Sequence, residues 1–151
     1  MLILAVDDET TVAEMIREIL EQEGHGCVIA GSVSDADWIL RAVTVDATLL
    51  DFTMPGRPPL DWLEDLARAD PLAAGRTVVM TGHRLDDGTI RRIRACGATL
   101  LQKPFGIDEL LEAVRDRSRR SDPLADATPR AARPAGMAAQ PRRRGRHWSL
   151  S

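Results

Sequence analysis

The sequence predicts a doubly wound α/β domain with a five-stranded parallel sheet and five helices. Short apolar runs alternate with segments whose apolar residues recur every three or four positions, the spacing of one helix face. The first run, Leu2–Val6, is continuously apolar, as expected for a strand that helices cover on both faces. Five such alternations are typical of βαβ units with right-handed crossovers.

Five short apolar runs are predicted as strands, and polar or turn-forming residues follow each of them. The runs are Leu2–Val6, Cys27–Ala30, Ala47–Leu50, Thr77–Met80 and Leu100–Gln102. The first run has no basic leader and is followed directly by three acidic residues, which fits a strand and not a signal peptide. Because no run approaches the length of a membrane span, we expect a soluble, cytoplasmic protein.

Five apolar stripes predict the helices. The stripes are Val12/Met15/Ile16/Ile19/Leu20, Ala36/Ile39/Leu40/Val43, Leu60/Leu63/Leu66/Ala67, Ile90/Ile93 and Ile107/Leu110/Leu111/Val114. We expect Asp8 or a threonine to cap the first helix and Ser34 or Asp35 to cap the second, since short polar side chains accept hydrogen bonds from free backbone N–H groups. The third helix should end near Asp70, because a residue before proline disfavours helical backbone, and Gly97 should end the fourth.

Composition divides the 151-residue chain into a domain, residues 1–119, and a tail, residues 120–151. Residues 1–120 hold 21 acids and 14 bases, a net charge of −7, whereas residues 121–151 hold 2 acids and 6 bases, a net charge of +4. The tail is rich in Pro, Ala and Arg and poor in large apolar residues, so we expect it to be disordered. Its arginine run, residues 141–146, could contact nucleic acid nonspecifically, but a solvated extension is the favoured interpretation.

The cysteines and the single lysine are both informative. Cys27 and Cys96 lie in apolar contexts without metal-site spacing, so we expect reduced thiols in or near the core and no zinc site. Of the 20 basic residues all but Lys103 are arginines. A solitary lysine in such a chain suggests a position that needs a compact, point-like ammonium.

Polar residues follow four of the five predicted strands, whose carboxyl ends lie along one edge of a parallel sheet. They are Asp7 and Asp8 after the first strand, Asp51 after the third, Thr81 after the fourth and Lys103 after the fifth. Converging carboxylates repel one another unless a cation lies among them or a pKa rises, and hard oxygen ligands favour Mg²⁺. The ammonium and the hydroxyl could then bind phosphoryl oxygens. Taken singly, the aspartates could be helix caps or loop residues, and Thr81 a turn hydroxyl.

At these residues the chain resembles the response-regulator receiver domains of bacterial two-component signalling. The shared features are, in order, Asp7-Asp8 after the first strand, Asp51 in LLDFTMPG, Thr81 after VVM and Lys103 in QKPF. Each motif is weak alone, but the ordered set over roughly residues 1–119 is specific. The resemblance implies the flavodoxin-like strand order 2-1-3-4-5.

The resemblance also implies roles for the acidic residues. Asp51 would be the phosphoacceptor, taking a phosphoryl group from a phosphohistidine on a kinase or phosphotransfer protein. Asp7 or Asp8, with Asp51 and the backbone carbonyl of Thr53, would hold Mg²⁺, and Asp8 is the favoured ligand of the first two. Lys103 would pair with the phosphoryl oxygens.

Three further features of the family concern residues around the acidic set. Thr81 would swing toward the phosphoryl group and shift its loop between two conformations. Thr53 and His83 would tune how fast the acyl phosphate hydrolyses, although a solvated loop histidine is the simpler interpretation of His83. The Lys103–Pro104 peptide bond is cis in this family.

Two departures from the family pattern concern how phosphorylation would be transmitted. Receivers usually carry Tyr or Phe three residues before the lysine, where this chain has Leu100. Pro58-Pro59 stands where a glycine is common and stiffens the entry to the third helix. The intact acidic set and Lys103 still favour chemistry at Asp51.

We therefore expect a stand-alone, non-enzymatic receiver whose phosphorylation alters its binding to another protein. Its partners would be a sensor histidine kinase or phosphotransfer protein and a downstream protein target, without membrane insertion. Two alternatives stay open: a receiver-like binding module that is not phosphorylated, and a regulator that binds nucleic acid through its arginine tail. A metal-dependent phosphatase is disfavoured, because Thr53 stands where a second aspartate would be needed.

Overall fold

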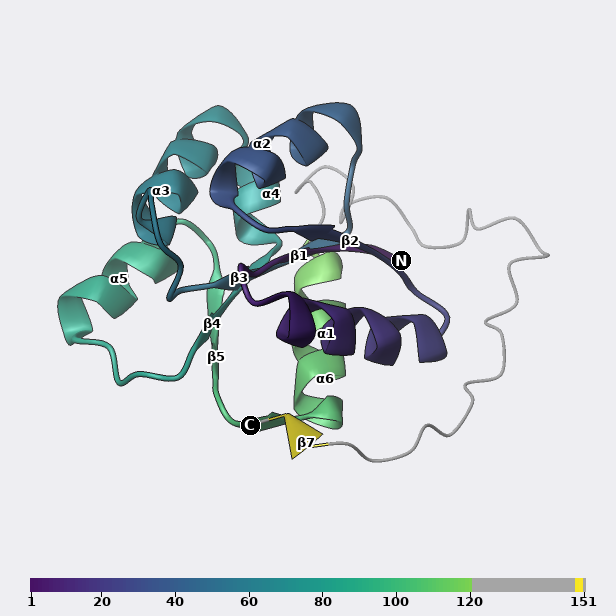
Figure 1. The fold of residues 1–151 in the computed structure, drawn as a ribbon. Helices are drawn as coiled ribbons and strands as arrows, with labels where there is room; N and C mark the ends of the chain where they lie inside the picture. Colours follow the sequence, from purple (N-terminus) through teal and green to yellow (C-terminus); the bar gives the residue numbers. More distant parts are fainter. Residues whose placement is uncertain (121–148, 151) are drawn as a thin grey trace.

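The computed structural model describes residues 1–120 and 149–150, and a five-stranded parallel sheet lies at its centre (Figure 1). The strands are β1 (Leu2–Val6), β2 (Gly26–Ala30), β3 (Ala47–Asp51), β4 (Thr77–Thr81) and β5 (Thr99–Gln102). Their order is β2-β1-β3-β4-β5, and every neighbouring pair is parallel. The predicted fold class and strand order are therefore confirmed.

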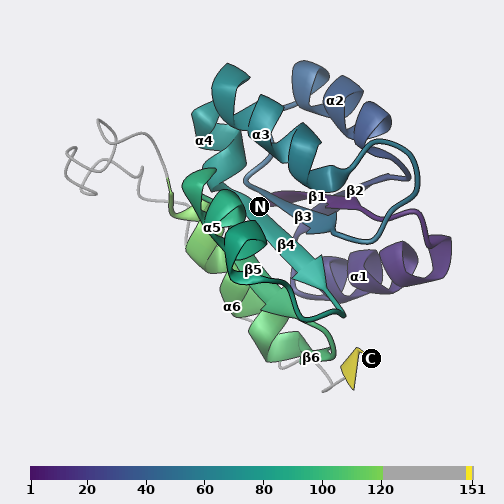
Figure 2. The same cartoon turned by 90° about the vertical axis from the view of Figure 1, so that its left-hand side faces the viewer.

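Helices cover both faces of this sheet (Figure 2). They are α1 (Thr10–Gln22), α2 (Val33–Ala42), α3 (Pro59–Ala69), α4 (Pro71–Gly75), α5 (Asp87–Ala95) and α6 (Ile107–Ser118). One core contains residues of α1 and α6 with Ile3 and Ala5 of β1, and the other contains residues of α2, α3, α4 and α5 with Leu4 and Val6. Successive residues of a strand point to opposite faces, so a strand covered on both faces, such as β1, places apolar residues in both cores.

The described residues form six helices, one more than the five that the sequence predicts. The third predicted helix ends as expected, at Ala69, but Asp70 then caps the short helix α4 by accepting a hydrogen bond from the N–H of Ala73 at 3.1 Å. Proline suits the first position of a helix, where its missing N–H needs no partner. Pro71 therefore separates two helices, and the second is too short to show an apolar stripe.

The predicted caps of the first two helices are wrong. Glu9 precedes α1, and no side-chain hydrogen bond caps that helix. The cap of α2 is Ser32, whose hydroxyl accepts a hydrogen bond from the N–H of Asp35 at 3.1 Å. Ser34 and Asp35 lie inside the first turn of α2, so the helix begins before the residues that were expected to start it.

Most residues of the predicted stripes are buried, but Met15 and Val43 are exposed, at 40% and 41%. Met15 lies on the flank of a stripe centred on Ala13, Ile16 and Leu20. Val43 follows the last turn of α2 and has extended backbone, so helical spacing no longer directs its side chain to the core. The two cysteines are free, and Cys96 is buried and Cys27 half-buried, as expected.

The predicted tail, residues 120–151, lies outside the described residues except for Arg120 and the strand β7 (Ser149–Leu150). The arginine run at residues 141–146 is among the residues that are not described. β7 was not predicted, and it pairs with another two-residue strand, β6 (Phe105–Gly106). None of the six helices combines the length and the apolar character needed to cross a membrane.

Candidate functional site

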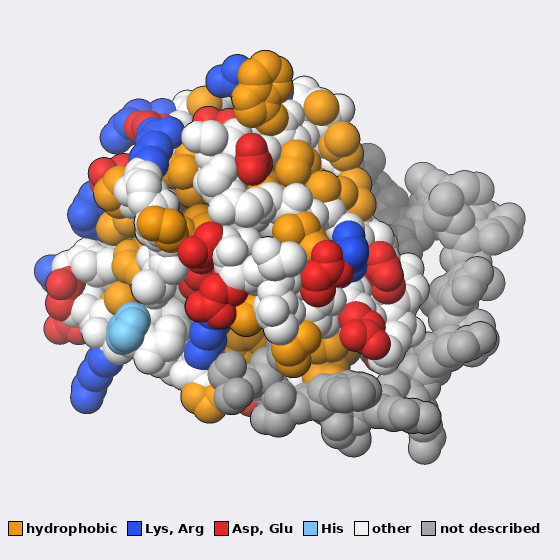
Figure 3. Space-filling view, viewed as in Figure 1, with side chains coloured by type: hydrophobic (Ala, Val, Ile, Leu, Met, Phe, Trp, Pro, Cys, Tyr) orange, Lys and Arg blue, Asp and Glu red, His pale blue; other side chains and the backbone are white. Residues whose placement is uncertain are grey.

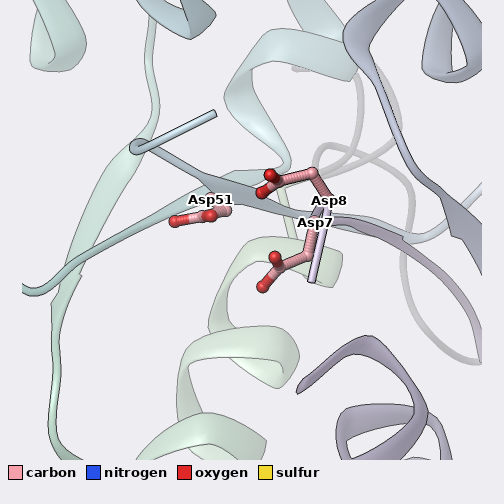
Figure 4. Close-up of side chains that lie close together, drawn as sticks. All are labelled: Asp7, Asp8 and Asp51. Carbon is pink, nitrogen blue, oxygen red and sulfur yellow. The ribbon is translucent and has the colours of Figure 1, made fainter. Parts of the chain in front are cut away.

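The carboxyl edge of the sheet brings together the three predicted aspartates (Figure 4). β1 and β3 are neighbours, with Val6 opposite Leu50, so the residues that come next, Asp7 and Asp51, emerge side by side. One carboxylate oxygen from each of Asp7, Asp8 and Asp51 lies within 4.8 Å of the other two. Asp7 and Asp51 are 2% and 5% exposed, whereas Asp8 is exposed to solvent. The cluster therefore meets solvent mainly through Asp8, and acidic side chains gather near the middle of the face shown in Figure 3.

Asp51 is fixed at the end of β3 by its neighbours in the sheet and in the following loop. The next residue, Phe52, donates its N–H to the carbonyl of Met80 at 2.9 Å, so the pairing with β4 continues past the carboxylate. The N–H of Thr53 donates to Oδ1 of Asp51 at 3.2 Å. The ammonium Nζ of Lys103 lies 3.6 Å from the same oxygen. This places one cation and one backbone donor on a single oxygen of the carboxylate.

Asp7 is the least satisfied acid of the cluster. Its Oδ1 accepts a hydrogen bond from the N–H of Glu9 at 2.9 Å, but its Oδ2 is buried and has no hydrogen-bond partner among the described residues. Burial raises the pKa of Asp7 to about 6, and the nearby charges of Asp51 and Asp8 also raise it, against the lowering effects of the Glu9 N–H and of Lys103. A buried, unpartnered carboxylate oxygen beside two further acids fits a divalent cation with hard oxygen ligands.

Lys103 reaches the cluster from the segment after β5. Its side chain is 24% exposed, and its backbone N–H donates to the carbonyl of Thr81 at 2.7 Å. The Lys103–Pro104 peptide bond is cis, as the resemblance implies. This segment therefore connects the carboxyl ends of β4 and β5.

Thr81 lies at the edge, but its hydroxyl bonds within its own loop. The hydroxyl donates to the carbonyl of His83 at 3.0 Å and accepts from the N–H of His83 at 3.1 Å. The side chains of His83 and Thr53 are exposed, whereas Thr81 itself is buried. Leu100 is half-buried, faces Val79 across the β4–β5 pair and packs against the core on the side of α5.

The structure brings together Asp7, Asp8, Asp51 and Lys103, and it leaves the Thr81 hydroxyl turned toward His83. Sequence reasoning missed three backbone contributions: the N–H groups of Glu9 and Thr53, which bond to carboxylates, and the peptide groups of His83. Asp and Thr side chains often bond to backbone two residues further on. The spacing of two residues could therefore have predicted all three of these contacts from the sequence.

The fold and the acidic edge define a doubly wound α/β domain whose clustered carboxylates suit a divalent cation. The chain belongs to the response regulator receiver domain family of two-component systems, whose sequence model matches residues 3–115. Receiver domains are signalling domains, generally not enzymes, and the family generally binds Mg²⁺ at its acidic site.

Curated relatives and solved structures agree with this family. The chain is 35% identical over 121 residues to the DNA-binding response regulator MtrA of Mycobacterium tuberculosis, covering 80% of this chain and 51% of MtrA. It is 33% identical over 136 residues to the response regulator receiver protein Anae109_2439 of Anaeromyxobacter, covering 82% of this chain and 56% of that protein. The chain thus spans about half the length of these relatives.

Two solved receiver domains show the same fold. A response regulator receiver domain protein from Clostridium thermocellum superposes with a TM-score of 0.69 at 26% identity, covering 79% of this chain and 94% of that chain. The beryllofluoride-activated receiver domain dimer of NtrC4 superposes with a TM-score of 0.71 at 24% identity, covering 80% of this chain and 98% of that chain.

Proposed function

We propose that the chain is a phospho-accepting response regulator in which Asp51 takes a phosphoryl group from a phosphohistidine. The donor would be a sensor histidine kinase or a histidine phosphotransfer protein, and the phosphorylated chain would bind a downstream protein differently. The observation that carries this proposal is the position of the Asp51 carboxylate, which lies at the open carboxyl edge between two further carboxylates and a lysine ammonium 3.6 Å away. A carboxylate so placed has a cation beside its oxygen that can bind the oxygens of an incoming phosphoryl group.

Asp7, Asp8, Asp51 and the backbone carbonyl of Thr53 would hold Mg²⁺. The unpartnered Oδ2 of buried Asp7 supports this assignment, because a bound cation satisfies that oxygen and relieves the repulsion between neighbouring acids. When bound, the ion would offset the repulsion between an anionic nucleophile and an anionic donor.

The transfer itself would use the Asp51 oxygen as nucleophile. A new oxygen–phosphorus bond forms as the phosphorus–nitrogen bond of the donor phosphohistidine breaks, and the imidazole leaves with its electron pair and takes up a proton. The ammonium of Lys103, already beside Oδ1 of Asp51, would bind oxygens of the transferred group. The chain's contribution is mainly position and charge.

Thr81 and α5 would carry the change outward. To reach a phosphoryl oxygen, the Thr81 hydroxyl has to leave the peptide groups of His83, and the loop between β4 and α5 has to move with it. Leu100 stands where the family usually has an aromatic residue that turns inward, so we propose that the loop and α5 carry this response. Exposed Thr53 and His83 would tune the lifetime of the acyl phosphate, with self-catalysed loss of phosphate as the only further reaction.

The test is phosphorylation by acetyl phosphate in the presence of Mg²⁺, followed by intact mass and a phosphate-affinity gel. The wild type should gain one phosphate, and Asp51→Asn should gain none, because an amide is not a nucleophile for phosphorus. Asp87→Asn, an equivalent change at an exposed residue of α5, should behave as wild type. A wild type without phosphate, or an Asp51→Asn variant that gains it equally, would exclude the proposal and favour an unphosphorylated binding module.

A further inference from the structure

The short strand β6 follows the lysine of the candidate site and pairs with a part of the chain far along the sequence. Phe105 and Gly106 face Leu150 and Ser149 in an antiparallel ladder that is separate from the main sheet. Figure 1 shows β7 beside the end of α6 at which that helix begins. In an antiparallel ladder, one facing pair exchanges two backbone hydrogen bonds and the next pair exchanges none. The pairing therefore protects the amide of either Phe105 or Gly106.

The β6 edge is held from the protein side independently of β7. The Phe105 side chain is 3% exposed and belongs to the same core as Ile107 and Leu110 of α6. Gly106 has extended backbone, with φ −82° and ψ 166°, and is the residue that precedes α6. An edge that is already extended and anchored can accept a second extended segment through backbone hydrogen bonds alone. β6 therefore has the properties of a strand-docking edge.

The same segment also carries the phosphoryl-site lysine. Lys103 lies two residues before β6, and its Nζ lies 3.6 Å from Oδ1 of Asp51. A phosphoryl group on Asp51 would come between these two groups, and the ammonium would have to move to meet the new oxygens. Backbone hydrogen bonds hold only over a narrow range of distances, so a ladder of two residues is sensitive to small displacements of its anchor.

We propose that β6 is a docking edge for the chain's own Ser149–Leu150 segment, and that phosphorylation of Asp51 weakens this docking. The second part rests on the proposed function of Asp51. The C-terminal segment would then be held at the rim of the site while Lys103 pairs directly with Asp51, and would become available to other proteins once that pair is separated. Coupling between the two sites passes through four consecutive residues, 103–106.

The pairing is tested in the full chain by amide hydrogen exchange. A Ser149→Pro/Leu150→Pro double variant removes both strand N–H groups and should speed exchange of the Phe105 or Gly106 amide about two- to tenfold, the effect expected for loss of one backbone hydrogen bond. A Ser149→Thr/Leu150→Val variant keeps both N–H groups and favours extended backbone, so it should exchange as wild type. Equal exchange in all three chains would overturn the docking edge.

The coupling is tested by the same exchange measurement after acetyl phosphate and Mg²⁺, with phosphate uptake followed by intact mass. In wild type, phosphorylation should bring the protected amide to the exchange rate of the proline variant, and in the proline variant it should change nothing further at that amide. Unchanged protection in a chain shown to carry phosphate would overturn the coupling and leave the proposed function standing. A chain that takes up no phosphate would overturn the proposed function of Asp51 and the coupling that rests on it. The comparison of wild type with the proline double variant would still decide whether β6 and β7 pair.

Discussion

The helices α5 and α6 each follow a residue of the candidate site, yet they are held to the sheet very differently. α6 follows Lys103 and buries Ile107, Leu110, Leu111, Val114 and even Arg117, whose guanidinium donates to the carbonyl of Gly97 at 2.9 Å. α5 follows the Thr81 loop, and its only buried residue is Ile93. The helix that follows the lysine is thus anchored in the core, whereas the helix that follows the threonine has little apolar surface to hold it.

Polar contacts with α3 also hold α5 in place. The Arg92 guanidinium pairs with Glu64 through two of its nitrogens and lies 3.6 Å from Asp61, and both acids belong to α3. Arg92 and Asp61 are exposed and Glu64 is half-buried, and ion pairs at the surface contribute little to stability. A helix held by one buried residue and by two surface ion pairs of a single arginine can change position at low cost. The difference between α5 and α6 therefore separates two parts of the molecule. The rigid half is α6 with the core around it, and the movable half is α5 with the Thr81 loop.

Matched truncations in α5 and α6 test whether the two helices differ in how firmly they are held. Leu110 and Ile93 are both fully buried, so each truncation removes a core side chain. Leu110→Ala should lower the free energy of unfolding by about 2–5 kcal/mol, the usual cost of such a cavity. Ile93→Ala should cost less, because the loss cannot exceed the free energy of opening α5 locally.

Urea unfolding measures the loss of stability in each variant, and amide hydrogen exchange of the folded variants shows where in the chain it occurs. In Ile93→Ala the faster exchange should be confined to α5, whereas in Leu110→Ala it should extend through α6 and the sheet. Equal losses of stability with uniform exchange would mean that α5 and α6 belong to one cooperative unit.

The acidic cluster at the carboxyl edge of the sheet should itself be destabilising when no metal is bound. The pKa of Asp7 is raised from 3.8 to about 6, so the folded chain keeps this proton at pH values where the unfolded chain has lost it. Stability should therefore fall as the pH rises from about 4 to about 6, and the loss is complete above that range. Asp7→Asn should raise the free energy of unfolding at pH 7 by about 1–3 kcal/mol and flatten this pH dependence.

Thermal or urea unfolding in EDTA across pH 4–8 measures the effect of Asp7→Asn. Asp8→Asn is the matched control, since Asp8 is exposed and should give a smaller gain. A variant no more stable than wild type, with the same pH profile, would show that burial of Asp7 is compensated elsewhere.

The sequence predicted the rigid half better than the movable half, for physical reasons. Strands buried on both faces and the strong stripe of α6 follow directly from apolar patterning, and Asp7, Asp51 and Lys103 follow from where parallel strands end. The predicted cap of α2 was wrong because several short polar residues lie close together in the sequence. Only the position of the helix in the fold selects Ser32 among them. α4 was missed because Asp70-Pro71 signals the end of a helix as clearly as the start of another.

The movable half depends on contacts that no local pattern encodes. Arg92 meets Glu64 across two helices that are far apart in sequence, and periodicity cannot pair them. The turn that holds the Thr81 hydroxyl uses the backbone of His83 and not its side chain. Outside this half, the unpartnered Oδ2 of Asp7 also follows from tertiary surroundings and not from a local pattern.

Loss of the ion pairs of Arg92 should affect α5 specifically while changing overall stability very little. Arg92→Met keeps much of the apolar stem of the side chain but removes the ion pair with α3, so global stability should change little. Exchange of α5 amides should nevertheless speed up about twofold, since the ion pair is one of few contacts that hold this helix. High salt should reduce the difference between variant and wild type, because screening weakens the pair in wild type.

Arg94→Met, on the same helix, is the matched control, because Arg94 takes part in none of the ion pairs between described residues. It should leave α5 exchange unchanged at any salt concentration. If Arg92→Met instead slowed exchange or acted equally on α5 and α6, the ion pair would not be what holds α5. If only α5 responds, the weakly held helix is the element that the Thr81 loop can displace, and its rest position depends on charge as well as on packing.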